Sequence, residues 1–295
     1  IRMSCMIIKL GFFIALCVMI VHGCRHLEAE NSCELDEELE RLVHQNTTRT
    51  KLFMLCHDEH SEHVSRKFIR CKESWMEPIM LNLSAFFETS MYKDVFPKHA
   101  AEWNTSDIDY VMTATYKTVH KLKLHEGIYY QQDLSEIKKM LQIARDGDYD
   151  FVPFLRSHTG LIDSILYWHG PSFKVAWDAL LLKLGYSIET VRKFDQAKPF
   201  YRNIFIAKPS VLLKLSDMMV RAMRVVKHEP DVAKLFEIDA KYAGGKEEVA
   251  VKVFGTRYYH LHPFIFERLP AFFLYEMGAK VCMNKPNQGP CPYNY

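Results

Sequence analysis

A dense cluster of histidines and carboxylates follows the first apolar run of the chain. Residues 57–63 read HDEHSEH and come directly after the run KLFMLC at Lys51–Cys56. If that run is a strand of an open α/β sheet, the cluster lies at the carboxyl edge of the sheet, where such folds bind ligands. We therefore expect His57, Asp58 and Glu59 to contact a ligand. One alternative is a divalent metal site of the kind a hydrolase uses, although the spacing matches no dedicated zinc motif. The other alternative is a solvated turn.

Two Asp-x-Asp triplets supply paired carboxylates, at Asp107–Asp109 and at Asp148–Asp150. Such pairs can chelate Mg²⁺ or Mn²⁺, and the ion can neutralise a departing diphosphate. Each triplet precedes an apolar run, which places it at the amino end of the predicted strand, opposite the edge where ligands bind. We predict Asp148 and Asp150 as the metal-binding pair, with an ordinary turn or cap as the alternative.

Two further candidates lie in the second half of the chain. His169 belongs to the stretch YWHGPSF, where Gly170 and Pro171 predict a sharp connection between two helices. It either contacts a ligand or is a structural histidine. Asp178 follows Trp177 on the next predicted helix. If Asp178 lies in a cleft, its carboxylate can act as a general base; otherwise it faces water.

Short apolar runs that alternate with longer helical patterns indicate the elements that position these groups. This order is typical of an α/β fold with a largely parallel open sheet and crossover helices. The predicted strands are Lys51–Cys56, Pro78–Leu83, Tyr110–Thr115, Phe151–Leu155 and Asn203–Ala207. The predicted helices, which make the C-terminal half mostly helical, are Leu134–Ala144, Thr159–Trp168, Phe173–Leu184, Val211–Val226, Asp231–Tyr242 and Phe264–Met277, the last closed by Gly278.

An apolar leader precedes the predicted domain. The stretch Met6–Gly23 contains an uninterrupted apolar run, Leu10–Val21, with Arg2 and Lys9 before it. This run is short for a transmembrane helix, which needs about 20 residues, and suits a cleaved signal peptide. A membrane anchor is the alternative if Lys9 snorkels to the headgroups. We therefore expect the secretory pathway, with the protein either secreted or held as a type II protein in the Golgi or ER membrane.

The expected organisation is a signal peptide or signal-anchor at residues 1–24, a charged stem at 25–50, one α/β domain at 51–281 and a tail at 282–295. The chain has 38 Lys and Arg against 36 Asp and Glu, and the two signs are interspersed. Binding to nucleic acid is disfavoured, because the sequence indicates no large positively charged surface to attract it.

If the chain enters an oxidising lumen, its cysteines can form disulfides and its sequons can be glycosylated. Cys282 and Cys291 are the favoured disulfide, because the Pro- and Gly-rich residues between them can close a small loop. Asn46, Asn82 and Asn104 each begin an Asn-x-Ser/Thr sequon and are candidate glycan acceptors.

Three segments resemble a glycosyltransferase family of the capsular-polysaccharide class, once described only as a domain of unknown function. Tyr110–Lys117 (YVMTATYK), preceded by Trp103 and Asp109, is similar to that family's W…DYVG…Y-R/K strand. Tyr201–Lys208 (YRNIFIAK) is similar to its NMFIxK strand, and His262–Leu269 (HPFIFERL) to its F-x-x-ERL helix start. The family's His-Tyr-Arg-Arg run reads Ala-Thr-Tyr-Lys here, so at most one of its basic residues is kept.

The resemblance implies a GT-A-like fold that binds a nucleotide-sugar near the loop after the first strand. Glu267 and Arg268 then lie close to the reaction centre. An Arg fork can grip phosphate oxygens at two points, and a neighbouring carboxylate can orient that Arg or deprotonate the acceptor hydroxyl. An ion pair at a helix start is the alternative for these two residues. The expected nucleotide-sugar contacts are His57, Asp58, Glu59, Tyr116, Lys117, His169, Asn203 and Arg268.

The expected function is transfer of a sugar from a nucleotide-sugar donor to a glycan or glycoprotein hydroxyl. Glu267 and Asp178 are the expected catalytic carboxylates, and Mg²⁺ or Mn²⁺ the expected cofactor. The alternative is a non-catalytic lumenal protein that binds glycans or acts as a scaffold on a transferase-like fold. The amino-edge position of both Asp triplets favours this alternative.

Overall fold

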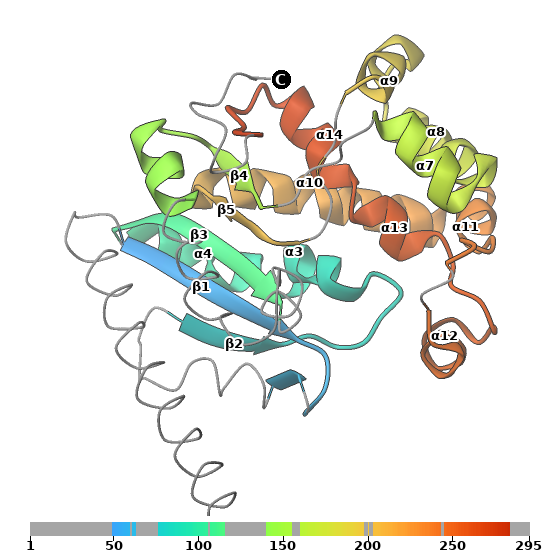
Figure 1. The fold of residues 1–295 in the computed structure, drawn as a ribbon, viewed down its shortest axis with the longest axis horizontal. Helices are drawn as coiled ribbons and strands as arrows, with labels where there is room; N and C mark the ends of the chain where they lie inside the picture. The colour runs from blue at the N-terminus through green and yellow to red at the C-terminus, as the bar shows by residue number, and fades with distance from the viewer. Residues whose placement is uncertain are drawn as a thin grey trace, which may run out of the picture.

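The computed structural model describes residues 49–59, 61–62, 76–105, 107–115, 140–154, 160–197, 200, 203–242 and 245–283 (Figure 1). The leader at Met6–Gly23 and the predicted stem up to residue 48 lie outside these ranges. Among the described helices, none combines the length and the apolarity that crossing a membrane requires. Cys282 is disulfide-bonded. Its predicted partner, Cys291, also lies outside the described residues.

The described strands form a single five-stranded sheet with the order β2-β1-β3-β5-β4. β1 pairs in parallel with β2 and with β3, whereas β5 is antiparallel to both β3 and β4. Four strands therefore run in one direction and β5 opposes them. The predicted α/β class with a largely parallel open sheet is confirmed, and the arrangement is consistent with a GT-A-like fold. The strands are β1 (Arg49–Cys56), β2 (Met76–Met80), β3 (Ile108–Thr115), β4 (Phe151–Pro153) and β5 (Phe205–Ala207).

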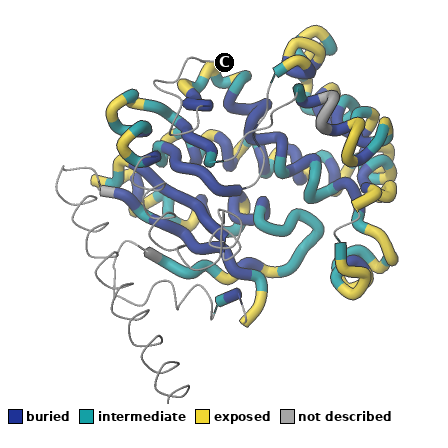
Figure 2. The backbone as a smooth tube through the Cα atoms, viewed as in Figure 1, coloured by how far each residue is buried: buried dark blue, intermediate teal, exposed yellow. Residues whose placement is uncertain are grey.

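The central strands are buried on both faces, which explains why they appear in the sequence as continuous apolar runs. In β1, Phe53 and Leu55 face the larger hydrophobic core, while Leu52 and Met54 face a smaller core on the opposite side. Figure 2 shows the strands as a buried band through the middle of the molecule. Successive residues of a strand therefore face the two cores in turn, because their side chains point to opposite faces of the sheet.

The larger core is closed by helices on one face of the sheet. Helix α10 packs against α3 and α4 there, and the helical residues 140–146 cover the smaller core through Met140 and Ala144. The described helices are η1 (Phe87–Ser90), α3 (Met91–Asp94), α4 (Phe96–Thr105), α7 (Leu161–His169), α8 (Pro171–Lys183), α9 (Ile188–Asp195), α10 (Pro209–His228), α11 (Pro230–Phe236), α12 (Glu247–Phe254), α13 (His262–Phe266) and α14 (Leu269–Glu276).

Proline and glycine set several of the helix boundaries. Gly170, with φ of 72°, ends α7 and caps α8, and Pro171 begins α8, as the sequence predicted. The predicted helix at Phe264–Met277 is instead two helices, because Pro270 lacks the N–H that would continue α13 into α14. Gly278, with φ of 62°, follows the end of α14 in the left-handed conformation expected of a residue that terminates a helix.

We predict that Phe272→Ala lowers the free energy of unfolding by about 3–5 kcal/mol, the range for truncating a buried aromatic residue. The Phe272 ring is fully buried and makes edge-on contacts with Trp177, Tyr186 and Phe194, so its removal leaves a cavity between α8, α9 and α14. Urea titration measures the change. Leu182→Ala, on the exposed side of α8, is the control and costs about 0.5 kcal/mol or less. Equal losses in the two variants would contradict this view of the core.

Candidate functional site

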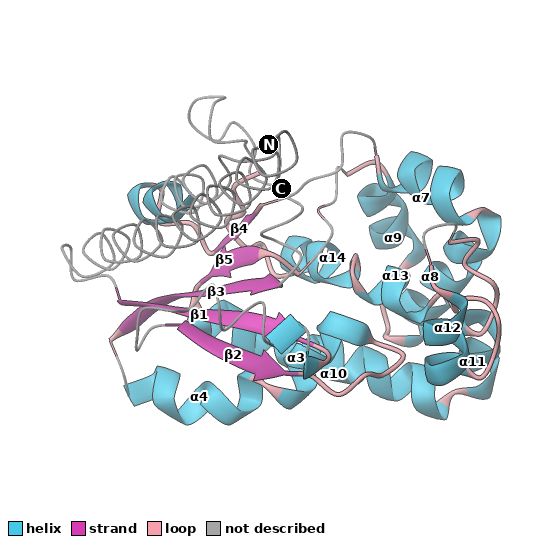
Figure 3. Cartoon of the chain, turned by 60° about the horizontal axis from the view of Figure 1, so that its bottom comes forward, coloured by secondary structure: helices cyan, strands magenta, loops and turns pink. Residues whose placement is uncertain are grey.

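The order of the strands places a topological switch point at the carboxyl ends of β1 and β3. From β1 the chain moves outward to β2 and then returns to β3 on the other side of β1. Open α/β sheets bind their ligands outside the strand ends at such a reversal, and we call this position the β1–β3 crevice. Figure 3 shows β1, β2 and β3 pointing toward the helices α7, α8 and α11 to α13, which we call the helical lobe (residues 161–183 and 230–266).

His57 lies at this crevice, in the position that the sequence predicted. It follows β1 directly, and its side chain is largely buried. Nε2 of His57 lies 3.3 Å from Oε1 of Glu88 on η1, but both ring nitrogens are buried and neither has a hydrogen-bond partner among the described residues. A buried polar atom without a partner is costly, so an additional ligand atom at Nδ1 would be favourable. Sequence reasoning missed Glu88, because no local pattern indicates this contact.

Asp58 forms a helix cap. Its Oδ1 accepts a hydrogen bond from the Ser61 backbone N–H at 2.7 Å, and Ser61 Oγ accepts one from the Asp58 N–H at 3.0 Å. This reciprocal pair is a capping box, which fixes the turn after β1. Glu59 begins the helical turn and is exposed. Asp58 therefore lies in a turn, which was the alternative to a ligand contact, and its carboxylate accepts a backbone hydrogen bond. Of the histidines that a metal site would need, His60 and His63 lie outside the described residues.

Asn203 lies at the same edge of the sheet as His57. Because β5 is antiparallel to β3, with Thr113 opposite Phe205, the residues before β5 lie beside the carboxyl end of β3. Asn203 is buried, and its carbonyl accepts a hydrogen bond from Thr113 Oγ1 at 2.8 Å. The two other predicted contacts at the end of β3, Tyr116 and Lys117, lie outside the described residues.

Aromatic contacts join the helical lobe to this edge of the sheet. Phe86, after β2, packs edge-on against Phe266 of α13, with 4.7 Å between ring centroids. Its neighbour Phe87 stacks on Tyr259 at 6.1 Å and contacts the ring of His57 at 6.4 Å. The lobe is therefore docked beside the strand ends. The adjacent pair of aromatic residues after the second strand is the sequence signal for this contact.

Arg268 and His169 meet in the interior, where the lobe joins α14. Arg268 Nη1 donates to the Phe264 carbonyl at 2.7 Å, and its guanidinium lies over the Phe173 ring at 5.4 Å. His169 packs between Phe173 and Phe264. Glu267 Oε2 lies 3.9 Å from Arg268 Nη1, with its side chain partly exposed. The structure thus brings three predicted site residues together: His169, Glu267 and Arg268.

His169 is neutral at physiological pH. Burial lowers its pKa to about 4, and the positive charge of Arg268 acts in the same direction, while a hydrogen bond with the Ala240 backbone opposes the shift. Nδ1 lies 2.9 Å from the Ala240 carbonyl, which can only accept, so Nδ1 carries the proton. His262, whose ring contacts Phe86 and Phe236, is similar, because burial lowers its pKa to about 4 as well.

Asp178 belongs to a different group of charges. Its carboxylate contacts Nζ of Lys174 one turn earlier on α8, and the same Nζ lies 3.0 Å from Oδ2 of Asp195 on α9. These contacts link α8 to α9, and none of the partners is a predicted site residue. A general-base role for Asp178 stays a prediction.

Asp148 and Asp150 lie at the opposite, amino edge of the sheet, before β4. Lys208, which follows β5, extends between them, with its Nζ 2.9 Å from Asp148 Oδ1 and 3.0 Å from Asp150 Oδ1. Burial lowers the pKa of Lys208, but the hydrogen bonds to both carboxylates outweigh it and raise that pKa overall. The same contacts lower the pKa of Asp148.

The carboxylate pair as it stands does not fit a divalent-cation site. Lys208 supplies the compensating charge, so a cation would have to displace it. Within the described ranges, no group of three or more His, Cys, Asp or Glu side chains is arranged to hold a metal ion. Asp107 and Asp109 also lie at the amino edge, Asp109 near the start of β3. Binding of Mg²⁺ or Mn²⁺ by this chain stays a prediction.

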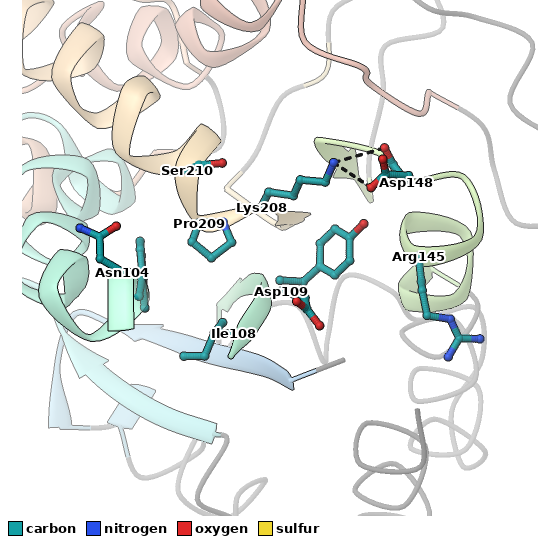
Figure 4. A pocket seen from close by; sticks show the side chains of 10 residues that line it. Asn104, Ile108, Asp109, Arg145, Asp148, Lys208, Pro209 and Ser210 are labelled. Carbon is teal, nitrogen blue, oxygen red and sulfur yellow. Dashed lines mark hydrogen bonds and ion pairs between the residues drawn. The ribbon is translucent and has the colours of Figure 1, made fainter. Parts of the chain in front are cut away.

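A cavity of about 440 Å³ opens at this amino edge (Figure 4). It lies between the end of α4, the start of β3, the turn at Arg145–Asp148 and the start of α10. Sequence reasoning missed it, because its lining comes from four segments that are distant in the sequence.

No protein-family model matches the sequence, and no curated protein matches it. A solved structure similar to this chain is the apo form of WbbM, described as a bifunctional glycosyltransferase, with a TM-score of 0.44 and 15% sequence identity. The match covers 79% of this chain and 44% of that one, so the chain spans less than half the length of WbbM.

We predict that His169→Gln weakens the pH dependence of stability between pH 6.5 and 4. The unfolded histidine has a pKa of about 6.5 and the folded one about 4, so the unfolded state binds more protons in this window. The contribution of His169 to the free energy of unfolding is therefore fully present above pH 6.5. It is lost as the pH falls from 6.5 to 4, by an amount on the order of 3 kcal/mol. Gln retains a donor for the Ala240 carbonyl but does not titrate.

Urea unfolding at pH 7, 6, 5 and 4 measures this effect. His228→Gln, at an exposed histidine on α10, is the matched control and should leave the pH dependence unchanged. His262 keeps part of the dependence in the His169 variant, since its pKa is lowered too. An unchanged slope in His169→Gln would contradict the burial of a neutral imidazole.

Proposed function

We propose that this chain is a glycosyltransferase that moves a sugar from a nucleotide-sugar to a hydroxyl of a glycan or glycoprotein in the secretory pathway. The observation that carries the proposal is His57 at the β1–β3 crevice, with a buried Nδ1 that lacks a partner among the described residues. A nucleotide-sugar can supply a polar atom to this nitrogen. Asn203 at the same edge and the resemblance of the segments around Tyr110, Asn203 and Glu267 to glycosyltransferases support it.

Arg268 and Glu267 are suited to the chemical step. In the proposed reaction the acceptor oxygen forms a bond to the anomeric carbon, and the bond from that carbon to the diphosphate oxygen breaks. The diphosphate leaves with the electron pair, and the acceptor proton passes to Glu267. Arg268 faces the developing negative charge, because a guanidinium fork matches phosphate geometry. His169, which is neutral and buried, adds no positive charge of its own.

A nucleotide-binding experiment tests the proposal. We expect at least one of UDP, GDP, ADP and CMP, each tried with and without Mn²⁺, to raise the melting temperature of the full chain. At a hundred times its Kd the ligand contributes about 2.7 kcal/mol, or about 5–10 °C for a domain of this size. His57→Ala should reduce the shift, whereas His228→Ala should keep it. No shift with any nucleotide would overturn the proposed function.

We further predict that the double variant Asp148→Asn/Asp150→Asn keeps the nucleotide-induced shift within about 1 °C of the shift in the unmodified chain. This carboxylate pair lies at the opposite edge of the sheet and is already bonded to Lys208. The melting temperature without ligand can fall, because the ion pairs are lost, so the shift is the quantity compared. Loss of the shift would return the metal site to Asp148 and Asp150.

A non-catalytic glycan-binding protein is the second candidate, and one observation favours it. Both Asp-x-Asp pairs lie at the amino edge of the sheet, away from the crevice. Release of nucleoside diphosphate from a panel of nucleotide-sugars distinguishes the candidates. Release that is lost in Glu267→Gln supports the transferase. Nucleotide-independent glycan binding without any release supports the second candidate.

A further inference from the structure

The cavity at the amino edge has an aromatic floor and a polar rim. Trp103 and Tyr110 form this floor and are buried, with 5% and 4% of their surface exposed. Asn104, Asp109 and Ser210 line the same cavity with exposed side chains. Figure 4 shows the rim groups arranged around the opening, with Lys208 and Asp148 joined across one side. A volume of about 440 Å³ falls within the range of small-molecule sites.

The two cations of the cavity wall, Lys208 and Arg145, are already paired. Lys208 is paired with Asp148 and with Asp150 at about 3 Å, and Arg145 Nε lies 3.3 Å from Asp146 Oδ1. An anion would have to compete with these carboxylates for Lys208, and a metal ion would meet the ammonium. A neutral ligand does not disturb the pairs.

The hydrogen-bonding groups of the rim select a ligand that both donates and accepts. Asp109 accepts, and Ser210 and Asn104 both donate and accept. Lys208 is already bonded to Asp148 and Asp150. Hydroxyl groups can pair with Asp109, Ser210 and Asn104, while the C–H faces of a pyranose ring can pack on the aromatic floor. This combination is the chemistry of a neutral sugar.

We propose that this cavity binds a neutral sugar residue of a glycan. Two sources supply this chemistry. One is a separate glycan, and the other is a glycan carried by Asn104 itself, which is exposed at the rim and begins the sequon Asn104-Thr105-Ser106. The cavity lies at the sheet edge opposite the nucleotide crevice. The proposal therefore stands or falls separately from the transferase function.

Saturation-transfer NMR on the full chain made in bacteria, which carries no N-glycan, tests the site. The probes are glucose, galactose, mannose and N-acetylglucosamine, with inorganic phosphate and Mn²⁺ as charged competitors. We expect at least one sugar to bind, and Asp109→Asn combined with Asn104→Ala to weaken it about tenfold. Asp217→Asn, which removes the same charge from an exposed position on α10 outside the cavity, is the matched control.

Three results would overturn the proposal: no binding of any of these sugars, binding that the double variant does not weaken, or competition by phosphate that depends on Lys208. Chemical-shift or melting curves of each variant confirm that it is folded. If sugars bind while no nucleotide does, the transferase function fails and the sugar site stands. The reverse result removes the sugar site alone.

The source of the sugar is distinguished with protein secreted from eukaryotic cells. Mass spectrometry measures glycan occupancy at Asn104, and Ser106→Ala removes the sequon without changing Asn104. If the glycan at Asn104 fills the cavity, the glycosylated chain no longer binds the free sugar and Ser106→Ala restores binding. If the glycosylated chain binds as well as the bacterial one, the site serves a separate glycan.

Discussion

Burial of the sheet on both faces is the constraint on which the rest of this structure depends. With hydrophobic cores against each face, the central strands can present polar groups only where they begin and end. All the chemistry at the sheet is therefore confined to its two edges. The carboxyl edge holds the crevice with His57 and Asn203, and the amino edge holds the cavity beside Lys208. The separation follows from packing, since a polar residue in the middle of β1 would be buried without a partner.

The helical lobe packs beside the carboxyl edge of the sheet. Phe86 and Phe87 extend from the sheet to α13 and to the loop before it, so the lobe is held by aromatic contacts rather than by charges. Arg268 is buried within this apolar junction, where its guanidinium lies over Phe173 and bonds to a backbone carbonyl. A charge in such surroundings interacts more strongly than one in water, which is why this Arg is suited to a phosphate.

Much of the fold could be predicted because its strands are apolar on both sides. All five predicted strands are confirmed to within a few residues. Two helices were predicted less well. Residues Leu269–Leu274 of α14 are buried all round, so the apolar pattern did not mark where α13 ends and α14 begins. The helix α12 was not predicted, and only Ala250 of it is buried. The partners of His57 and Asp148 could not be predicted either, because Glu88 and Lys208 are brought to them by tertiary packing.

The direction of one strand determines the electrostatic character of the amino edge. Because β5 runs opposite to its neighbours, it ends where β4 begins, and Lys208 arrives beside Asp148 and Asp150. A parallel β5 would have ended at the crevice and left two carboxylates together, which is the arrangement that binds a divalent cation. The antiparallel strand instead converts this pair into an ion-paired wall. Lys208 is therefore already bonded within that wall, and hydrogen bonding by the other rim groups determines what the adjoining cavity can hold.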